Sequence, residues 1–172
     1  MIHHVEFEQW VPAVLERVFL FFANPGNLPR IMPPQSGTKL VRVNLVPPSG
    51  VAVEHSRLTT DPVAGAGSEI VTSFRVFPFL PFRAAWIALI TEFEWNHHFA
   101  DIQKKGPFKS FQHRHELRAE KRNEVNGTSV RDRIDYEVGF GWLGEIAQKF
   151  FVSRQLRRTF RYRQQALENL LR

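Results

Sequence analysis

Hydrophobic and polar residues alternate along most of the chain, in short runs separated by turn-forming residues. In the first run, residues 2–10, Val5 and Phe7 share one side and polar residues occupy much of the other, which predicts a β-strand. Between Thr38 and Val138 about six further strands are expected, because Pro, Gly, Asn and Asp recur there at intervals without a helical period. This pattern is typical of an antiparallel meander.

Two regions have the helical period instead. After Pro12, apolar residues recur every three or four positions as far as Phe22, and a second short helical turn is expected at 28–32. The C-terminal stretch 142–171 predicts one long helix with an apolar stripe. That stripe consists of Trp142, Ile146, Leu156, Phe160, Leu167 and Leu171.

These elements together predict an α+β fold in a single domain, residues 1–172. A curved antiparallel sheet of about seven strands wraps around the long C-terminal helix, with two short helices after the first strand. The length of 172 residues suits one domain. The 16 Phe, 4 Trp and 2 Tyr favour a wide apolar interior, and a sheet that grips a helix commonly leaves a cavity between them.

Composition excludes several classes of protein. The chain has no Cys, which excludes disulfide scaffolds, thiolate metal sites and cysteine nucleophiles. Its start lacks the pattern of a signal peptide, and no uncharged apolar run reaches 18 residues, so we expect a cytoplasmic protein without a membrane span.

The formal net charge of +6 is concentrated in the final segment, residues 149–172. The exposed side of the predicted helix carries Arg154, Arg157, Arg158 and Arg161. One interpretation is a solvated face paired with carboxylates of the sheet; the other is an interaction surface for anionic lipid or for a partner. Because base-stacking aromatic residues are absent among these arginines, no nucleic acid is expected as a partner, whereas transient membrane contact stays open.

Several motifs resemble those of bacterial SRPBCC proteins, the START and birch-pollen-allergen-like superfamily. The first helix and turn match in Phe21-Phe22-Ala23-Asn24-Pro25, Leu28 and Pro33-Pro34. The most specific block is Phe99-x-Asp101-x-Gln103-x-x-Gly106-Pro107-Phe108 followed by Phe111-x-His113-x-His115. The resemblance continues through Gly127-Thr128, Asp132, Tyr136, Gly141, Gly144 and Phe160-x-Tyr162-Arg163. Two positions depart from it, since Gly139 stands where relatives often have Pro and Phe111 where Trp is usual.

The resemblance implies a helix-grip fold that encloses an apolar cavity for lipids, sterols, polyketides or similar molecules. Within the superfamily, the sequence resembles the polyketide cyclase/dehydrase-like branch. Carriers, sensors and aromatase/cyclases share this scaffold, so the activity has to be argued from the site.

Strand parity predicts which side chains face the interior. In residues 111–119 the odd positions are mostly apolar but include His113 and His115, so two histidines point inward. If the turns close symmetrically, Asp101 faces His113 and Phe99 faces His115 across one hairpin. Across a turn at Asn126-Gly127, Asp132 comes beside His115 or one step along.

The inner wall defines the candidate ligand-binding residues. They are Phe93, Trp95, Phe99, Asp101, Gln103, His113, His115, Leu117, Asp132, Ile134, Tyr136, Leu156 and Phe160. For the paired residues Asp101, His113, His115 and Asp132, three roles remain open: satisfying each other's buried polar groups, anchoring the oxygen-bearing end of an apolar ligand, or acid/base catalysis.

A metal site is not expected, nor is any cofactor. The spacing from Gly106 through His113 and His115 to Glu120 lies close to a cupin motif, but Glu120 points outward and no second motif with a third histidine follows. The adjacent pairs His3-His4 and His97-His98 are expected to point to opposite faces, which makes them poor chelators.

One further segment stands out, because 77–82 carries three Phe and a Leu between prolines. It predicts either an entrance lid or a plug of the cavity. The sequence therefore favours a carrier or sensor that binds a hydrophobic small molecule between sheet and helix. The alternatives are an aromatase/cyclase that uses the inward His-Asp pairs, and an interaction module that uses the basic helix.

Overall fold

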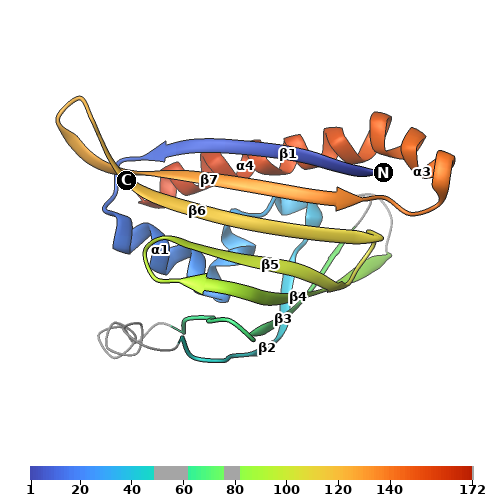
Figure 1. Ribbon diagram of the computed structural model, residues 1–172, viewed down its shortest axis with the longest axis horizontal. Helices are drawn as coiled ribbons and strands as arrows, with labels where there is room; N and C mark the ends of the chain where they lie inside the picture. The colour runs from blue at the N-terminus through green and yellow to red at the C-terminus, as the bar shows by residue number, and fades with distance from the viewer. Residues whose placement is uncertain (49–61, 76–81, 172) are drawn as a thin grey trace.

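Seven antiparallel strands form one curved sheet in the spatial order β1-β7-β6-β5-β4-β3-β2 (Figure 1). The computed structural model describes residues 1–48, 62–75 and 82–171. The strands are β1 (Ile2–Val11), β2 (Lys39–Asn44), β3 (Glu69–Arg75), β4 (Arg83–Glu94), β5 (His98–Lys105), β6 (Ser110–Arg122) and β7 (Val125–Glu137). The predicted strand at the start and six strands of the meander are confirmed.

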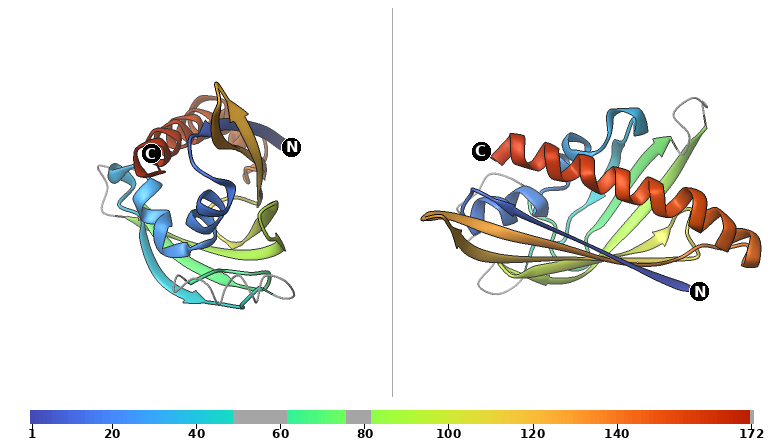
Figure 2. Two further views of the ribbon diagram at one scale, coloured as in Figure 1. Left: turned by 90° about the vertical axis from the view of Figure 1, so that its left-hand side faces the viewer. Right: turned by 90° about the horizontal axis from the view of Figure 1, so that it is seen from above.

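The helices lie on the concave side of the sheet, which curves around them (Figure 2). They are α1 (Leu15–Ala23), the 3₁₀ helices η1 (Pro25–Ile31) and η2 (Pro34–Ser36), α3 (Gly141–Ala147), the π-helical turn η3 (Gln148–Val152) and α4 (Ser153–Leu171). The short helices after β1 and the long C-terminal helix match the predicted α+β layout. No helix among the described residues is long and apolar enough to cross a membrane.

The buried stripe predicted for the C-terminal helix is correct only for its α4 part. Phe160, Leu167 and Leu171 are buried, whereas Trp142 is 72% exposed and Ile146 is 49% exposed. The prediction was wrong for these two residues because α3 lies near the ends of the strands, where Glu145 rather than Trp142 or Ile146 contacts β1, at His3 (Figure 2).

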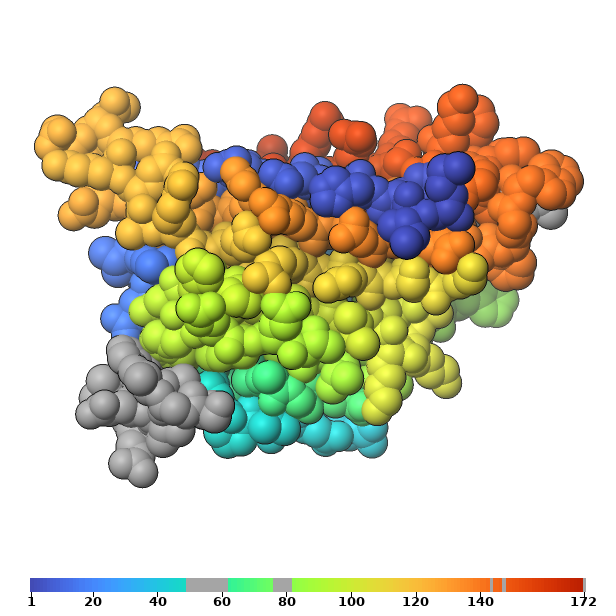
Figure 3. Space-filling view, viewed as in Figure 1, coloured from blue at the N-terminus to red at the C-terminus, as the bar shows by residue number. Residues whose placement is uncertain are grey.

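The β6–β7 hairpin turns three residues before the expected Asn126-Gly127, and it extends past the body of the sheet (Figures 1 and 3). Its loop is Asn123-Glu124, both with positive φ (47° and 64°), which suits a two-residue hairpin. Gly127, predicted in the turn, pairs with Glu120 inside β7. A Cβ there would lie 2.4 Å from the ring of Trp10, so this glycine permits the close approach of β1 and β7.

The outer, convex face of the sheet carries cross-strand pairs of charged side chains. Arg131 lies 3.3 Å from both Glu6 and Glu8, and Arg133 lies 3.4 Å from Glu6. Each cross-strand pair contributes little on its own in solvent. The polar face nevertheless fixes which side of the sheet is buried, and so directs the odd-numbered positions of β6 toward the helices.

Candidate functional site

A cavity of about 370 Å³ lies between the concave face of the sheet, the helices that follow β1, and α4. Its walls are mostly apolar: Phe22 comes from α1, Ile31 from η1, Trp86 from β4 and Leu156 from α4. The volume falls within the usual range for a small-molecule site. The predicted cavity between sheet and helix is therefore present.

Six of the residues predicted to face the ligand line this cavity. They are Phe99, Asp101, His113, His115, Leu156 and Phe160. The remaining seven do not line the cavity, because the inner face of the sheet is longer than the cavity and helices cover its ends.

Phe93, Trp95 and Leu117 belong to the core beneath α1 and do not line the cavity. The ring of Phe19, from α1, packs at 5.4 Å from Phe93 and 5.3 Å from Trp95, measured between centroids. Parity placed these residues on the correct face, but α1 covers that end of the sheet.

Gln103, Ile134 and Tyr136 support the cavity from its other end. The Gln103 amide closes the β5–β6 turn: its Nε2 donates to the Phe108 carbonyl and its Oε1 accepts from the Phe108 N–H. Ile134 and Tyr136 are fully buried in a cluster with Phe160, and the Tyr136 hydroxyl accepts a hydrogen bond from Gln148.

The predicted pairing of histidines with carboxylates is confirmed. In the sheet register Asp101 pairs with His113, Phe99 with His115, and His115 with Asp132. His113 Nε2 lies 3.0 Å from Asp132 Oδ1, and His115 Nδ1 lies 2.6 Å from the same oxygen, although off the line that a good hydrogen bond requires. Asp132 therefore stands behind both histidines and outside the cavity wall.

Burial and these contacts set the protonation states. The two histidines hold the pKa of Asp132 well below its ordinary value, against the opposing effect of burial. Burial lowers the pKa of His113 to about 4 and lowers that of His115 as well. At neutral pH Asp132 is thus an anion that accepts hydrogen bonds, and His113 is neutral with its proton on Nε2.

This tautomer leaves the Nδ1 lone pair of His113 directed toward Asp101, whose Oδ1 lies 3.9 Å away. Burial raises the pKa of the Asp101 carboxyl. The separation is too long for a direct hydrogen bond, and both groups line the cavity. A ligand hydroxyl placed there can reach both of them.

Arg163 is a cavity residue that the sequence analysis did not place in the site. Its guanidinium carbon lies 4.7 Å from the centroid of the Phe160 ring, and burial lowers its pKa against the attraction of Asp132 and Asp101. Among the described residues none forms a hydrogen bond or an ion pair with this guanidinium. Its position two turns of helix from Leu156, on the inner side of α4, was the available signal.

The arrangement of the histidines favours a hydrogen-bonded network over a metal centre in the cavity. Candidate ligand atoms of Asp101, His113 and His115 lie within 4.8 Å of one another. Asp132 Oδ1, however, already contacts one nitrogen of each histidine.

The adjacent histidine pairs differ from each other. His3 and His4 contact different partners, Glu145 and Asp135. The prediction that His97 and His98 point to opposite faces was wrong: their Nδ1 atoms lie 2.9 Å apart, because His97 belongs to the β4–β5 turn rather than to the strand.

The four arginines predicted on the outer side of α4 are all exposed. Within residues 1–48, 62–75 and 82–171 no carboxylate forms an ion pair with Arg154, Arg157, Arg158 or Arg161, so the expected pairing with sheet carboxylates is not found there. The predicted lid or plug, 77–82, lies outside the described residues except for Phe82, which is 73% exposed.

Solved structures with the same architecture are numerous. Protein CV1439 from Chromobacterium violaceum aligns with a TM-score of 0.63 and 12% identity, over 98% of this chain and 96% of the other. A START superfamily protein from Mycobacterium smegmatis gives 0.62 and 14% over 98% and 97%. Truncated norcoclaurine synthase from Thalictrum flavum gives 0.61 and 12% over 99% and 93%. No family model matches the chain, and no curated protein matches it in sequence.

The chain has the START-type helix-grip fold. At these identities the likeness concerns the fold alone, and it confirms the fold that the resemblance implied. Because the neighbours with this helix-grip fold include an enzyme by name, norcoclaurine synthase, fold does not decide between binding and catalysis. The side chains of the cavity have to supply that argument.

Proposed function

We propose that this helix-grip protein binds a hydrophobic small molecule with one oxygen-bearing end, and acts as a carrier or sensor. The observation that supports this most is a mostly apolar cavity of about 370 Å³ whose lining includes Asp101 and His113 from the sheet and Arg163 from α4. Such a cavity holds an apolar body by burial and orients it through a small number of hydrogen bonds.

The polar groups define the chemistry of the ligand's oxygen-bearing end. His113 Nδ1 is an acceptor and fits a hydroxyl group. Arg163 supplies N–H donors without a protein partner in the described residues, and fits a carbonyl or a carboxylate. At the end of an apolar body, an ionised acid satisfies Arg163, and an enol with a neighbouring carbonyl, which also donates an O–H, satisfies both.

The acid/base alternative receives less support from the same geometry. A general base works best with a pKa near the working pH, whereas the pKa of His113 is about 4 and that of Asp132 is lower than usual. His113 is therefore a weak base at neutral pH, and among the four paired residues only Asp101 has a pKa shifted, by burial, toward neutrality. We assign it to ligand contact, and the aromatase/cyclase reading would require turnover that His113→Gln abolishes.

The first prediction concerns the ligand class. The protein is expected to bind the neutral fluorophore Nile red at about 1:1 stoichiometry, and decanoate is expected to displace it. Arg163→Gln should weaken displacement by decanoate about tenfold or more and leave Nile red binding nearly unchanged, because a charge-assisted hydrogen bond contributes about 1.5–3 kcal/mol. Fluorescence titration measures both affinities.

Arg161→Gln is the matched control, since Arg161 is an exposed arginine on the same helix. It should behave like the wild type in both titrations. Equal weakening by the two variants would remove Arg163 from the site, and absence of Nile red binding would contradict the proposed function itself.

A second candidate function is association with anionic membranes through the C-terminal helices. Exposed apolar side chains occur at Trp142, Ile146 and Phe150, four residues apart, and Arg154 and Arg158 continue the same spacing. Rings that lie beside exposed cations are suited to the interface of an anionic bilayer. Phe151, in the same π-helical turn, lines the cavity, so the exposed surface adjoins the ligand site.

The second prediction tests this surface by cosedimentation with vesicles. Wild-type protein should bind vesicles that contain phosphatidylglycerol, and binding should weaken as salt is raised. Arg154→Glu with Arg158→Glu should weaken it about tenfold or more, since each basic residue near an anionic surface contributes about 1 kcal/mol. Arg118→Glu with Lys121→Glu makes the same change of net charge on the β6–β7 hairpin and should have a much smaller effect. Salt-independent binding, or equal loss in both variants, would contradict a specific surface.

A further inference from the structure

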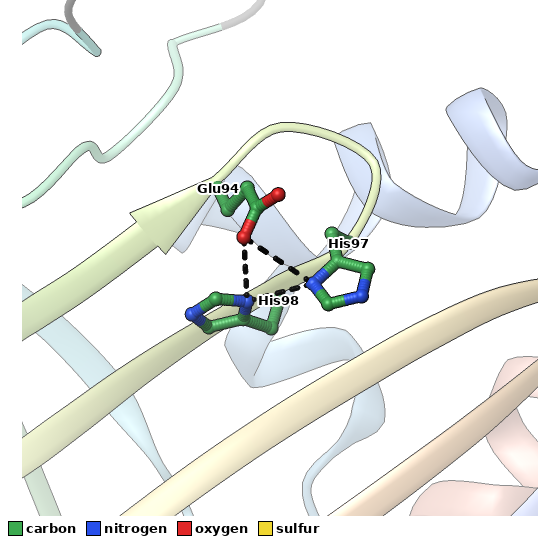
Figure 4. A group of neighbouring side chains, drawn as sticks. All are labelled: Glu94, His97 and His98. Atoms are coloured by element: carbon green, nitrogen blue, oxygen red, sulfur yellow. Dashed lines mark hydrogen bonds and ion pairs between the residues drawn. The ribbon is translucent and has the colours of Figure 1, made fainter.

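Three side chains with metal-binding atoms converge at the β4–β5 turn, on the polar face of the sheet and away from the cavity (Figure 4). Glu94 is the last residue of β4, His98 is the first of β5, and the two pair across the hairpin. His97 belongs to the turn, in which Asn96 has a positive φ of 57°. This local conformation brings two consecutive histidines onto the same side.

The distances suit a single ion. The two Nδ1 atoms lie 2.9 Å apart, and Glu94 Oε2 lies 3.4 Å from each of them. Ligand atoms bound at about 2.0–2.1 Å around a tetrahedral zinc lie about 3.3–3.4 Å from one another. The observed distances among the two Nδ1 atoms and Glu94 Oε2 therefore differ by no more than a few tenths of an ångström from those around a bound ion.

Glu92 orients His98 from outside the triangle. His98 Nε2 lies 3.3 Å from Glu92 Oε2, and Arg114 forms an ion pair with that same carboxylate oxygen. The nearby carboxylate favours the tautomer with its proton on Nε2, in which His98 Nδ1 presents its lone pair toward Glu94 and His97. A carboxylate on the far nitrogen of a histidine is the usual support for a metal-bound imidazole.

We propose that Glu94, His97 and His98 form a binding site for a divalent transition-metal ion, with Zn²⁺ as the best match. Two imidazoles and one carboxylate are zinc ligands, and they leave a fourth position for water or a further ligand. The side chains of Glu94 and His97 are 62% and 65% exposed, so an ion reaches the site from solvent. The ion binds the lone pair of His97 Nδ1, so the single proton of the neutral imidazole is then on Nε2. If that proton was on Nδ1 before, binding moves it to Nε2.

The test is zinc titration of the purified protein with histidines labelled by ¹⁵N. The chain has seven histidines, so their ring nitrogens can be followed individually by NMR. Zn²⁺ is expected to shift the resonances of His97 and His98, with their Nδ1 atoms as ligands, and calorimetry should give one ion per chain. A shift confined to His113 and His115 would overturn the proposal, because it would place the ion in the cavity.

Variants test the proposed zinc ligands and the supporting carboxylate of Glu92 separately. His97→Gln and Glu94→Gln should each weaken zinc binding by more than about tenfold, and Glu92→Gln by about 10–100-fold, the usual cost of losing an outer carboxylate. His3→Gln with His4→Gln removes another adjacent histidine pair and should leave the affinity unchanged. Equal affinity in the wild type and His97→Gln would overturn the site. Since Glu94 and His97 are exposed, their variants should keep the wild-type circular dichroism spectrum, which checks that the fold is intact.

Discussion

Replacing Phe160 with alanine is expected to lower the free energy of unfolding by about 3–5 kcal/mol. The ring is only 3% exposed and stacks on Phe7 at 4.4 Å between centroids, with an interplanar angle of 3°. It also lies beneath the Arg163 guanidinium and 5.5 Å from the ring of His113. Its removal therefore deletes contacts with Phe7 of β1, with Arg163 of α4 and with His113 of the polar cluster. Urea denaturation at neutral pH measures the loss.

Phe150→Ala is the control, because that ring is 71% exposed in η3, ten residues before Phe160. It should change the free energy of unfolding by less than about 0.5 kcal/mol. A loss below about 1 kcal/mol for Phe160→Ala would mean that the ring is not part of the core between sheet and α4.

Acidification from pH 7 to pH 4 is expected to remove about 3 kcal/mol of stability through His113 alone. Its pKa is about 4 in the folded protein and ordinarily 6.5, so over this interval the unfolded chain binds the proton more tightly. Each pH unit between the two values corresponds to about 1.4 kcal/mol. Stability is therefore full above pH 6.5 and falls as the pH drops toward 4. His115 acts in the same direction, whereas the raised pKa of Asp101 opposes both at the acid end.

The measurement is urea denaturation of the wild type and His113→Gln at several pH values in this interval. The variant should be less stable at pH 7 and should lose less stability on acidification. Ile134→Val, which keeps both histidines and costs about 0.5–1.5 kcal/mol, shows whether lower stability alone alters the slope. Parallel pH profiles for wild type and His113→Gln would mean that His113 titrates equally in both states.

Strand parity predicted the polar cluster well, because side chains in a sheet can face only two ways and the hydrophobic positions select one of them. The pairing of Asp101 with His113 followed from counting outward from the β5–β6 turn. The pairing of His115 with Asp132 did not: counting from Asn126-Gly127 puts Val138 opposite His115, and Asp132 lies there because the chain turns at Asn123-Glu124. The hairpin turn itself was misplaced, since Asn-Gly is a stronger turn signal than Asn123-Glu124. The misplaced turn did not change which residues of β6 and β7 were predicted to point inward. That prediction came from the alternation of apolar residues along each strand.

Parity could not tell where the helices would end or what they would cover. Phe93 and Trp95 face inward as expected, yet α1 packs on them and the cavity begins beyond. Trp142 has the helical spacing of a core residue, but spacing carries no information about where the sheet stops. Arg163 was not predicted as a cavity residue for a related reason. It follows several arginines in the sequence, and such a run indicates a basic surface. Only the way α4 packs against the sheet distinguishes it from its exposed neighbours.

The pairing of β1 with β7 has a consequence for how the protein folds as it is synthesised. Ile2 pairs with Glu137 and Val11 with Thr128, so every contact in this ladder spans more than a hundred residues. At about 5–20 residues per second, a ribosome makes β7 on the order of ten seconds after β1. During that interval the meander β2–β6 can form by local hairpins and α1 can pack on β4 and β5, while β1 lacks its partner strand β7. The cavity is therefore completed in the last step of folding, and a nascent chain should acquire ligand affinity only once its C-terminal third has been made.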